Sequence, residues 1–299
     1  MQTYDPRNES IMVHVGGQLL PRDQAKVSVF DSTVQGGDAV WEGLRVYDGR
    51  IFMLDRHLRR MASSAHAMAY THIPPAAEIK AAIFETLKAN GMRDHAHIRL
   101  TLSRGLKITS GMDPRLNQDG SCLIVLAEWK SPIYDAGGIR LVTSSVRRNS
   151  PQCLDSKIHH NNLINNILAK IESNLAGVDD ALMLDIQGFV SETNATNFFL
   201  VRDGRLYTPY ADSCLPGITR SVVLELAGEH GIPAQKKNLS LTEVYAADEA
   251  FTTGTMGELS PVLEVDGRRI GDGKPGAMTG RIQALYAEQT SELGEPLPF

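Results

Sequence analysis

The chain has 299 residues, of which 42% are hydrophobic and 22% charged, and its formal net charge is -5. This length favours two domains, and the composition is typical of a water-soluble globular protein. The modest charge and the scattered Lys and Arg residues argue against a nucleic-acid-binding surface, and no run approaches the roughly 20 apolar residues of a membrane span.

The first part of the chain mixes strands and helices. Helical spacing of apolar residues predicts two surface helices, and alternating or β-branched residues predict strands. The expected strands cover residues 26–31, 39–47, 97–103 and 121–128, and the expected helices cover residues 54–68 and 76–90. Asp48, Gly49 and Arg50 supply a hairpin turn, and Gly91 ends the second helix.

A stretch without periodicity separates this part from the rest. Residues 129–138 (WKSPIYDAGG) combine Pro, Asp and paired Gly, which indicates a linker between a smaller N-terminal domain, 1–128, and a larger C-terminal domain, 139–299. In the second part, the expected strands cover residues 139–144, 180–185, 197–201, 206–208 and 249–253, and the expected helices cover 161–174, 219–228 and 280–288. Strands and helices intermix throughout, so the fold class is α+β (α/β mixed).

The N-terminus and the cysteines give no sign of export. MQTYDPRNES has no basic segment followed by an apolar one, which predicts a cytoplasmic protein. Cys122, Cys153 and Cys214 are far apart and lack metal-ligand spacing, so we expect reduced thiols and no metal site. The ligand should therefore be a small molecule, not nucleic acid or a membrane.

Lys157 is the candidate nucleophile. It lies in LDSKIHHNNLINNIL, just before an apolar helix, in a polar segment whose His and Asn side chains can line a site. A lysine becomes a useful nucleophile when neighbours or burial lower its pKa. From this local context alone, a solvated lysine at a helix start remains the alternative.

Glu192 is the second candidate. It lies in GFVSETNATNFFLV, in a polar turn between two strand-like segments. A carboxylate in this place can pair with the protonated pyridine nitrogen of a cofactor and keep the ring an electron sink. Thr193, Asn194 and Thr196 are alternatively ordinary turn formers, because such side chains bond to local backbone.

Two further segments suit phosphate binding. In CLPGITRSVVLELA, Ile218 and Thr219 stand at a helix start, where exposed N–H groups and the helix dipole favour an anion. In TTGTMGELSP, Gly254, Thr255 and Gly257 can cradle a phosphate or a substrate carboxylate through backbone amides. A plain capped helix and ordinary turn chemistry remain the alternatives.

Six blocks in this order make the chain resemble the class IV aminotransferases, the pyridoxal-phosphate enzymes of fold type IV, over nearly its whole length. The blocks are VWEGLRVYDGRIFMLDRHLRRM, IRLTLSRG, the Lys157 segment, the Glu192 segment, LPGITR and TGTMGELSPVLEVDGRRIGDGKPGAMT. The resemblance implies pyridoxal 5'-phosphate at the junction of two domains, of which the C-terminal one binds it, and a homodimer. It also implies ping-pong transfer of an amino group between an amino acid and a 2-oxo acid.

The resemblance assigns roles to individual residues. Lys157 holds the cofactor as a Schiff base and then moves the substrate proton, Glu192 meets the pyridine nitrogen, and Arg60 grips the phosphate with its two-pronged side chain. The other implied cofactor contacts are Asn197, Ile218, Thr219 and Thr255. The expected substrate contacts are Trp41, Arg99, Arg104, Thr255 and Met256, although either arginine is alternatively a solvent-facing strand residue and Met256 a packing residue.

The blocks carry features of two subfamilies. WEGLR, with Trp41, and Arg99 resemble enzymes for branched-chain L-amino acids, but Gly36 and Asn162 replace tyrosines that those enzymes usually have. LSRG, with Arg104, resembles the D-amino-acid aminotransferases. The likeness of RRNSPQCLDSKIHHNN, SETNATNFF and GTMGELSP to plant D-amino-acid transaminases favours a D-amino acid such as D-alanine. The alternatives are a branched-chain L-amino-acid aminotransferase and an aminodeoxychorismate lyase, which eliminates pyruvate.

Overall fold

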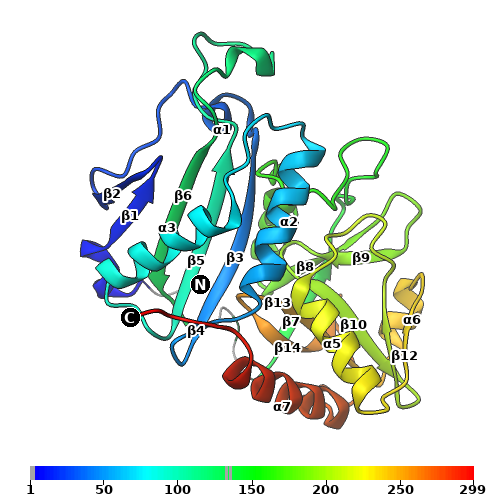
Figure 1. Cartoon of the computed structure of the whole chain (residues 1–299). Helices are drawn as coiled ribbons and strands as arrows, with labels where there is room; N and C mark the ends of the chain where they lie inside the picture. Colours follow the sequence, from blue (N-terminus) through cyan, green and yellow to red (C-terminus); the bar gives the residue numbers. More distant parts are fainter. Residues whose placement is uncertain (1–3, 132–133, 135–136) are drawn as a thin grey trace. The chain divides into compact units, whose positions relative to one another are not determined.

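Two sheets divide the chain between them in the computed structural model, which describes residues 4–131, 134 and 137–299 (Figure 1). Unit 1 comprises Met1–Ser131, Ile158–Asn162 and Thr290–Phe299, and unit 2 comprises Pro132–Lys157 and Leu163–Gln289. Each unit contains both strands and helices, which confirms the predicted α+β class. Among the described residues, no helix has the length and apolar character needed to cross a membrane.

Unit 1 is built on a sheet with the strand order β16-β4-β3-β5-β6-β1-β2. Its strands are β1 (Met12–Val15), β2 (Gln18–Pro21), β3 (Ala39–Tyr47), β4 (Arg50–Ile51), β5 (Ala96–Ser103), β6 (Cys122–Trp129) and β16 (Glu295–Pro296). Its helices are η1 (Pro6–Ser10), α1 (Ser32–Gly36), α2 (Leu54–Ala67), α3 (Ala76–Ala89) and η2 (Pro114–Leu116). Helix α2 packs on β3, and α3 packs on β6 and β1 (Figure 1).

The apolar residues of α2 explain its position. Leu54, Leu58, Met61 and Ala65 recur on one helical face, and all four are buried in the core that α2 shares with the sheet. Two buried polar residues, His57 and Ser64, also lie on this helix. Helix α2 therefore combines the core of unit 1 with buried polar groups: His57 contacts Glu42 on β3, and Ser64 accepts a hydrogen bond from the backbone N of His159.

The turn between β3 and β4 agrees with the sequence, but the first expected strand does not. Asp48 and Gly49 both have positive φ angles, 45° and 74°, as a tight hairpin turn requires. The strand expected at 26–31 is wrong, because apart from one isolated bridge at Asp31 the segment pairs with no strand. Asp31 instead caps α1 by accepting a hydrogen bond from the backbone N of Thr33 at 2.8 Å.

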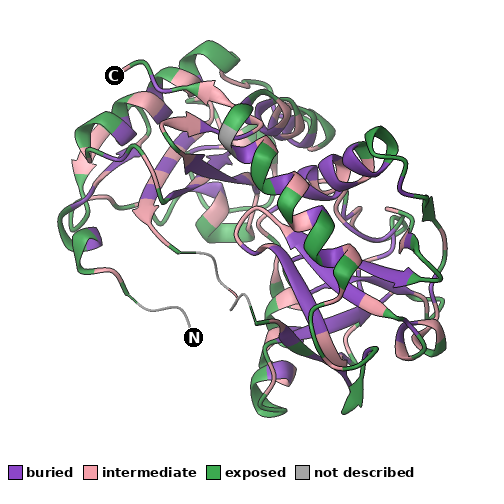
Figure 2. Cartoon of the chain, turned by 90° about the horizontal axis from the view of Figure 1, so that it is seen from below, coloured by how far each residue is buried: buried purple, intermediate pink, exposed green. Residues whose placement is uncertain are grey.

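Unit 2 is built on a sheet with the strand order β12-β11-β10-β13-β14-β7-β8-β9, and β15 pairs with β14. Its strands are β7 (Ile139–Thr143), β8 (Asp180–Leu184), β9 (Val190–Thr193), β10 (Asn197–Arg202), β11 (Arg205–Thr208), β12 (Ala234–Lys236), β13 (Glu249–Gly254), β14 (Glu258–Val265) and β15 (Arg268–Arg269). Its helices are α4 (Ile164–Leu175), α5 (Ile218–Glu229), α6 (Leu241–Tyr245) and α7 (Ala277–Glu292). Figure 2 shows the central strands largely in the colour of buried residues.

The division into units differs from the expected domain boundaries of 1–128 and 139–299 in two places. Residues 158–162 belong to unit 1, where the backbone N of Asn161 donates to the carbonyl of Ala39 and that of Trp41 donates to the carbonyl of His159, both at 2.9 Å. Residues 290–299 also belong to unit 1, because β16 pairs with β4. Within the expected linker, 129–138, residues 132–133 and 135–136 lie outside the described residues.

Candidate active site

Lys157 presents its amine at the end of a polar turn in unit 2. Its backbone N donates to Oδ1 of Asp155 at 2.9 Å, which fixes the turn. Its Nζ lies 3.4 Å from Oδ1 of Asp155 and 3.4 Å from the carbonyl oxygen of Asp212. The side chain is 44% exposed, so the amine is accessible to a ligand and is held only by long contacts.

Glu192 is a buried carboxylate on β9. Its Oε1 lies 2.7 Å from Nη2 of Arg148, and its Oε2 accepts a hydrogen bond from Nδ2 of Asn197 at 3.1 Å. Burial raises the pKa of Glu192, and the neighbouring Arg148 opposes that effect. The carboxylate is therefore enclosed together with a counter-charge that favours its ionised form.

The start of α5 lies beside this carboxylate. Gly217 is the N-cap of α5 and makes no side-chain capping bond, so the helix begins with backbone N–H groups that no side chain caps. A Cβ on Gly217 would collide with Oδ1 of Asn197, which shows that only glycine permits this approach. Ile218 and Thr219 follow and are buried.

The turn between β13 and β14 approaches the same region of unit 2. A Cβ on Gly254 would lie 2.9 Å from Cγ2 of Thr196, so this turn closely approaches the turn between β9 and β10. The next residues, Thr255 and Met256, are half-buried. Unit 2 therefore connects Glu192, Asn197, the start of α5 and this turn through close contacts.

A second buried carboxylate, Glu42, organises polar groups in unit 1. It is completely buried on β3, and Arg60 contacts both of its oxygens, with Nε at 2.8 Å from Oε1 and Nη2 at 2.6 Å from Oε2. Nδ1 of His57 lies 2.7 Å from Oε2, and Nδ1 of His159 lies 3.3 Å from Oε1. Glu42 thus fixes the position of the Arg60 side chain.

Burial and the charge of Arg60 determine which of the groups around Glu42 are ionised. Burial opposes ionisation of Glu42, yet the adjacent His159 and Arg60 hold its pKa well below its usual range. Burial also lowers the pKa of His159 to about 4. Because His159 is then neutral at pH 7, Arg60 is the lasting counter-charge of Glu42.

Trp41 and Arg99 form a second contact group in unit 1. The guanidinium carbon of Arg99 lies 3.4 Å from the centroid of the Trp41 ring, and its Nη2 donates to Oδ1 of Asn161 at 3.0 Å. Trp41 Nε1 donates to the carbonyl of His160 at 3.1 Å. Burial lowers the pKa of Arg99 to about 10, and among the described residues no carboxylate forms an ion pair with it. Arg99 is therefore a half-buried cation suited to an anionic ligand.

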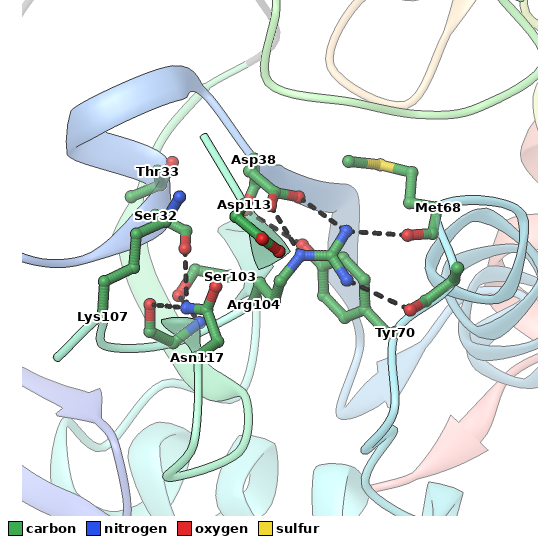
Figure 3. Close-up of polar contacts among 12 residues, drawn as sticks. Ser32, Thr33, Asp38, Met68, Tyr70, Ser103, Arg104, Lys107, Asp113 and Asn117 are labelled. Carbon is green, nitrogen blue, oxygen red and sulfur yellow. Dashed lines mark hydrogen bonds and ion pairs between the residues drawn. The ribbon is translucent and has the colours of Figure 1, made fainter. Parts of the chain in front are cut away.

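Arg104 is held in a separate network (Figure 3). Its Nε and Nη2 lie 2.6 Å and 3.2 Å from the two carboxylate oxygens of Asp38. Its guanidinium also donates to the carbonyls of Met68 at 2.7 Å and Ala69 at 3.1 Å, and it lies 4.4 Å from the centroid of the Tyr70 ring. Asp38 is therefore the counter-charge of Arg104 in this structure.

Comparison with known proteins places this arrangement in a family. The model of the family described as amino-transferase class IV matches residues 39–265. A putative branched-chain-amino-acid aminotransferase of Methanocaldococcus jannaschii is 39% identical over 94% of this chain and 97% of that protein. The chain belongs to the class IV aminotransferases.

Other members of the class IV aminotransferases are similar in sequence and fold. Branched-chain-amino-acid aminotransferase-like protein 2 of Arabidopsis thaliana is 59% identical over 98% of this chain, and the chain spans about half the length, 53%, of that relative. A solved branched-chain amino acid aminotransferase complexed with N-(5'-phosphopyridoxyl)-L-glutamate has a TM-score of 0.88 and 33% identity, covering 94% of each chain. These likenesses confirm the resemblance and the fold type inferred from the sequence.

In this class IV aminotransferase, the predicted site residues fall into two groups. The group in unit 2 contains Lys157, Glu192, Asn197, Ile218, Thr219, Thr255 and Met256. The group in unit 1 contains Trp41, Arg60, Arg99 and Arg104. Arg60 and Arg104 differ from Arg99 because a carboxylate, Glu42 or Asp38, already contacts each guanidinium. The roles assigned to these residues stay predictions.

Glu42 and Arg148 of this class IV aminotransferase were not predicted as site residues from the sequence. A signal for Glu42 exists, because strand alternation places it on the same face as the buried Val40 and Leu44, where a carboxylate needs a partner. No comparable signal marks Arg148, because its importance comes from a distant partner in the chain, Glu192.

Because unit 1 of this class IV aminotransferase contains buried histidines, we predict that acid lowers its free energy of unfolding. Burial lowers the pKa of His97 to about 3, with Lys130, Arg45 and Arg99 adding to the effect, and that of His159 to about 4. Between about pH 6.5 and pH 4 the unfolded chain binds protons at these sites and the native chain does not, so the free energy of unfolding falls as the pH falls. The low pKa of Glu42 acts in the same direction at more acidic pH.

Urea unfolding followed by tryptophan fluorescence measures this effect, because Trp41 and Trp129, the two tryptophans of the chain, both lie in unit 1. The midpoint should be lower at about pH 5 than at about pH 7.5. His97→Gln should reduce the difference, and the same change at the exposed His95 should not. Equal midpoints at the two pH values would contradict the burial of neutral histidines.

Proposed function

We propose that the protein is a pyridoxal 5'-phosphate-dependent aminotransferase that transfers an amino group between a branched-chain L-amino acid and a 2-oxo acid. The observation that carries the proposal is the accessible Lys157 amine in the same unit as the buried Glu192 carboxylate and the uncapped start of α5. The names of the relatives support the same reaction.

The residues of unit 2 fit the cofactor. Each oxygen of a carboxylate accepts two hydrogen bonds. The side-chain partners of Glu192 are Arg148 and Asn197, and they leave capacity for a pyridine N–H. The first N–H groups of α5, at Ile218 and Thr219, suit the phosphate because α5 has 12 residues and no side-chain cap. Thr255 is proposed as a further phosphate contact. Arg60 of unit 1, whose Nε and Nη2 contact Glu42, is proposed as another.

The chemistry divides between the cofactor and the chain. When bound, pyridoxal 5'-phosphate supplies the electron sink that stabilises negative charge at the substrate Cα. Glu192 keeps a negative charge at the pyridine nitrogen, and the α5 amides hold the phosphate in place. With the cofactor bound, the Lys157 amine would be the base that takes the proton from the substrate Cα and then the acid that gives it up to the cofactor.

Arg99 is the better candidate for the substrate carboxylate. It is a half-buried cation without a carboxylate partner among the described residues, and Trp41 packs against its guanidinium. Arg104, by contrast, already binds both oxygens of Asp38. We therefore propose Arg99 for recognition and Arg104 for holding the segment after β5 in place.

The preferred donor distinguishes the branched-chain proposal from the D-amino-acid hypothesis that the sequence favoured. The relatives in several organisms are named branched-chain-amino-acid aminotransferases, which supports the branched-chain alternative. Purified holoenzyme is mixed separately with L-leucine and with D-alanine, and the loss of absorbance of the enzyme-bound cofactor is followed. L-leucine should convert the cofactor, and conversion by D-alanine alone would overturn the branched-chain proposal.

The same assay separates the remaining alternatives. Release of pyruvate from aminodeoxychorismate over many turnovers, without a 2-oxo acid acceptor, would indicate a lyase, and we expect none. Arg99→Met should weaken the response to L-leucine by about tenfold or more, since a charged hydrogen-bond partner is lost. Arg104→Met should leave the response to substrate concentration close to that of the unaltered protein; the opposite order would assign the carboxylate to Arg104.

We also propose that the protein forms homodimers. Helix α4 exposes a row of apolar side chains at helical spacing, and contiguous exposed apolar surface is typical of an interaction site. The row consists of Ile164, Ile167, Leu168, Ile171 and Leu175. Sedimentation of the purified protein measures the mass, and twice the mass of the chain is expected. The cytoplasmic location stays a prediction from the sequence.

A further inference from the structure

Arg148 is a buried cation fixed from two sides in unit 2. Its side chain is 7% exposed and lies in the segment between β7 and α4. Nη2 lies 2.7 Å from Oε1 of Glu192, and Nη1 donates to Oδ1 of Asn166 on α4 at 2.9 Å. Asn166 in turn donates to the carbonyl of Asn194, two residues after Glu192, at 2.7 Å. The guanidinium is thus held between α4 and β9 in one orientation.

The other groups near Glu192 cannot replace this charge. Arg220 on α5 is buried, but its guanidinium donates to Oγ1 of Thr208 at 3.2 Å and to the carbonyl of Pro209 at 2.7 Å. Burial raises the pKa of the Cys214 thiol, so that group stays neutral. Among the described residues, Arg148 is the cation within ion-pair distance of Glu192.

The contribution of Arg148 to stability does not explain its burial. Its Nε is buried and has no hydrogen-bond partner among the described residues. An unsatisfied buried donor is unfavourable, and a buried ion pair is often no more stable than packed apolar residues of similar volume. The arrangement is better explained by what the charge does to Glu192.

We propose that Arg148 is a positioning residue that keeps the Glu192 carboxylate ionised and turned toward the pyridine nitrogen of the cofactor. The inference rests on the proposed function, because it gives Glu192 a cofactor to meet. Arg148 itself is not proposed to touch substrate or cofactor. It acts by favouring the charged form of a carboxylate that burial alone would neutralise.

The protonation of Glu192 in the cofactor-free protein tests this directly. Infrared spectra detect the C=O stretch of a protonated carboxyl group, and Glu192→Gln assigns the band. Arg148→Met replaces the guanidinium with a shorter, uncharged and unbranched side chain and should produce the protonated band at neutral pH. Arg148→Lys should restore the ionised form in part. Arg147→Met is the matched control, since Arg147 is the exposed neighbour, and should resemble the unaltered protein.

Binding of the cofactor gives a second readout. Arg148→Met should lower the affinity for pyridoxal 5'-phosphate by about tenfold or more, because a charged hydrogen bond becomes a neutral one. It should also move the pH dependence of turnover, which a purely structural role would not do. An ionised Glu192 and unchanged affinity in folded Arg148→Met would overturn the inference.

Arg148→Met tests the inference only if it folds. If it does not fold, the spectra of the unaltered protein and of Arg148→Lys are compared. A Glu192 carboxyl that is protonated at neutral pH in the unaltered protein would overturn the inference. An ionised Glu192 in the unaltered protein, with partial loss of the ionised form in Arg148→Lys, would support it. If the unaltered protein shows an ionised Glu192 but no transamination, the proposed function fails and the electrostatic role of Arg148 stands.

Discussion

Lys157→Ala is expected to reduce transamination by at least about a thousandfold. The substitution removes the amine that joins the cofactor and also the base that moves the proton at Cα, and a positioned base alone contributes about 10²–10⁴-fold. The fold should be retained, because the Lys157 side chain is accessible and makes only long contacts, each 3.4 Å. Steady-state turnover with L-leucine and a 2-oxo acid measures the loss.

Two controls separate chemistry from general damage. Lys88→Ala changes an exposed lysine on α3 and should leave turnover unchanged. A small amine such as methylamine, added to Lys157→Ala, should restore part of the rate, because it can move the proton in place of the missing side chain. A normal rate in Lys157→Ala would exclude Lys157 from the reaction.

Glu192→Gln is expected to destabilise unit 2 by about 3–5 kcal/mol, since it leaves the charge of Arg148 buried without its partner. Most of the turnover should be lost as well, because a neutral amide cannot hold a negative charge at the pyridine nitrogen. Hydrogen exchange of unit 2 amides measures the destabilisation, and tryptophan fluorescence does not, because both tryptophans lie in unit 1.

A double variant isolates the ion pair from other effects. Arg148→Met combined with Glu192→Gln removes both charges, so it should be more stable than Glu192→Gln alone. Glu192→Gln with the exchange rates of the unaltered protein would show that the 2.7 Å contact is not a buried ion pair in solution.

Local patterns predicted the elements that local residues determine. The hairpin at Asp48 and Gly49 and the helix over 54–68 follow from turn chemistry and helical spacing, and both are present. The strand predicted at 26–31 is absent because alternating residue types do not by themselves provide a neighbouring strand to pair with. The capping bond of Asp31 starts α1 instead. Strand β14 was missed because Gly257, Ser260 and Pro261 resemble a turn, yet β13 and β7 pair with it on both sides.

The candidate site was predicted where a motif carries the chemistry and missed where a distant contact does. Lys157 and Glu192 stand in polar segments that local context alone leaves ambiguous, and the resemblance to the class IV aminotransferases assigns their roles. Arg148 gains its importance from Glu192, and the return of residues 158–162 to β3 depends on backbone bonds to Ala39 and Trp41. Such long-range contacts arise from tertiary packing, which one sequence does not specify pair by pair.

The lysine that holds the cofactor can be located directly on the chain. Purified holoenzyme is treated with borohydride, which fixes pyridoxal 5'-phosphate to the amine that holds it, and the labelled peptide is identified by mass spectrometry. A phosphopyridoxyl group is expected on Lys157, and it should be absent after prior treatment with L-leucine. A label on another lysine, or no label on a protein that transaminates, would contradict the role of Lys157.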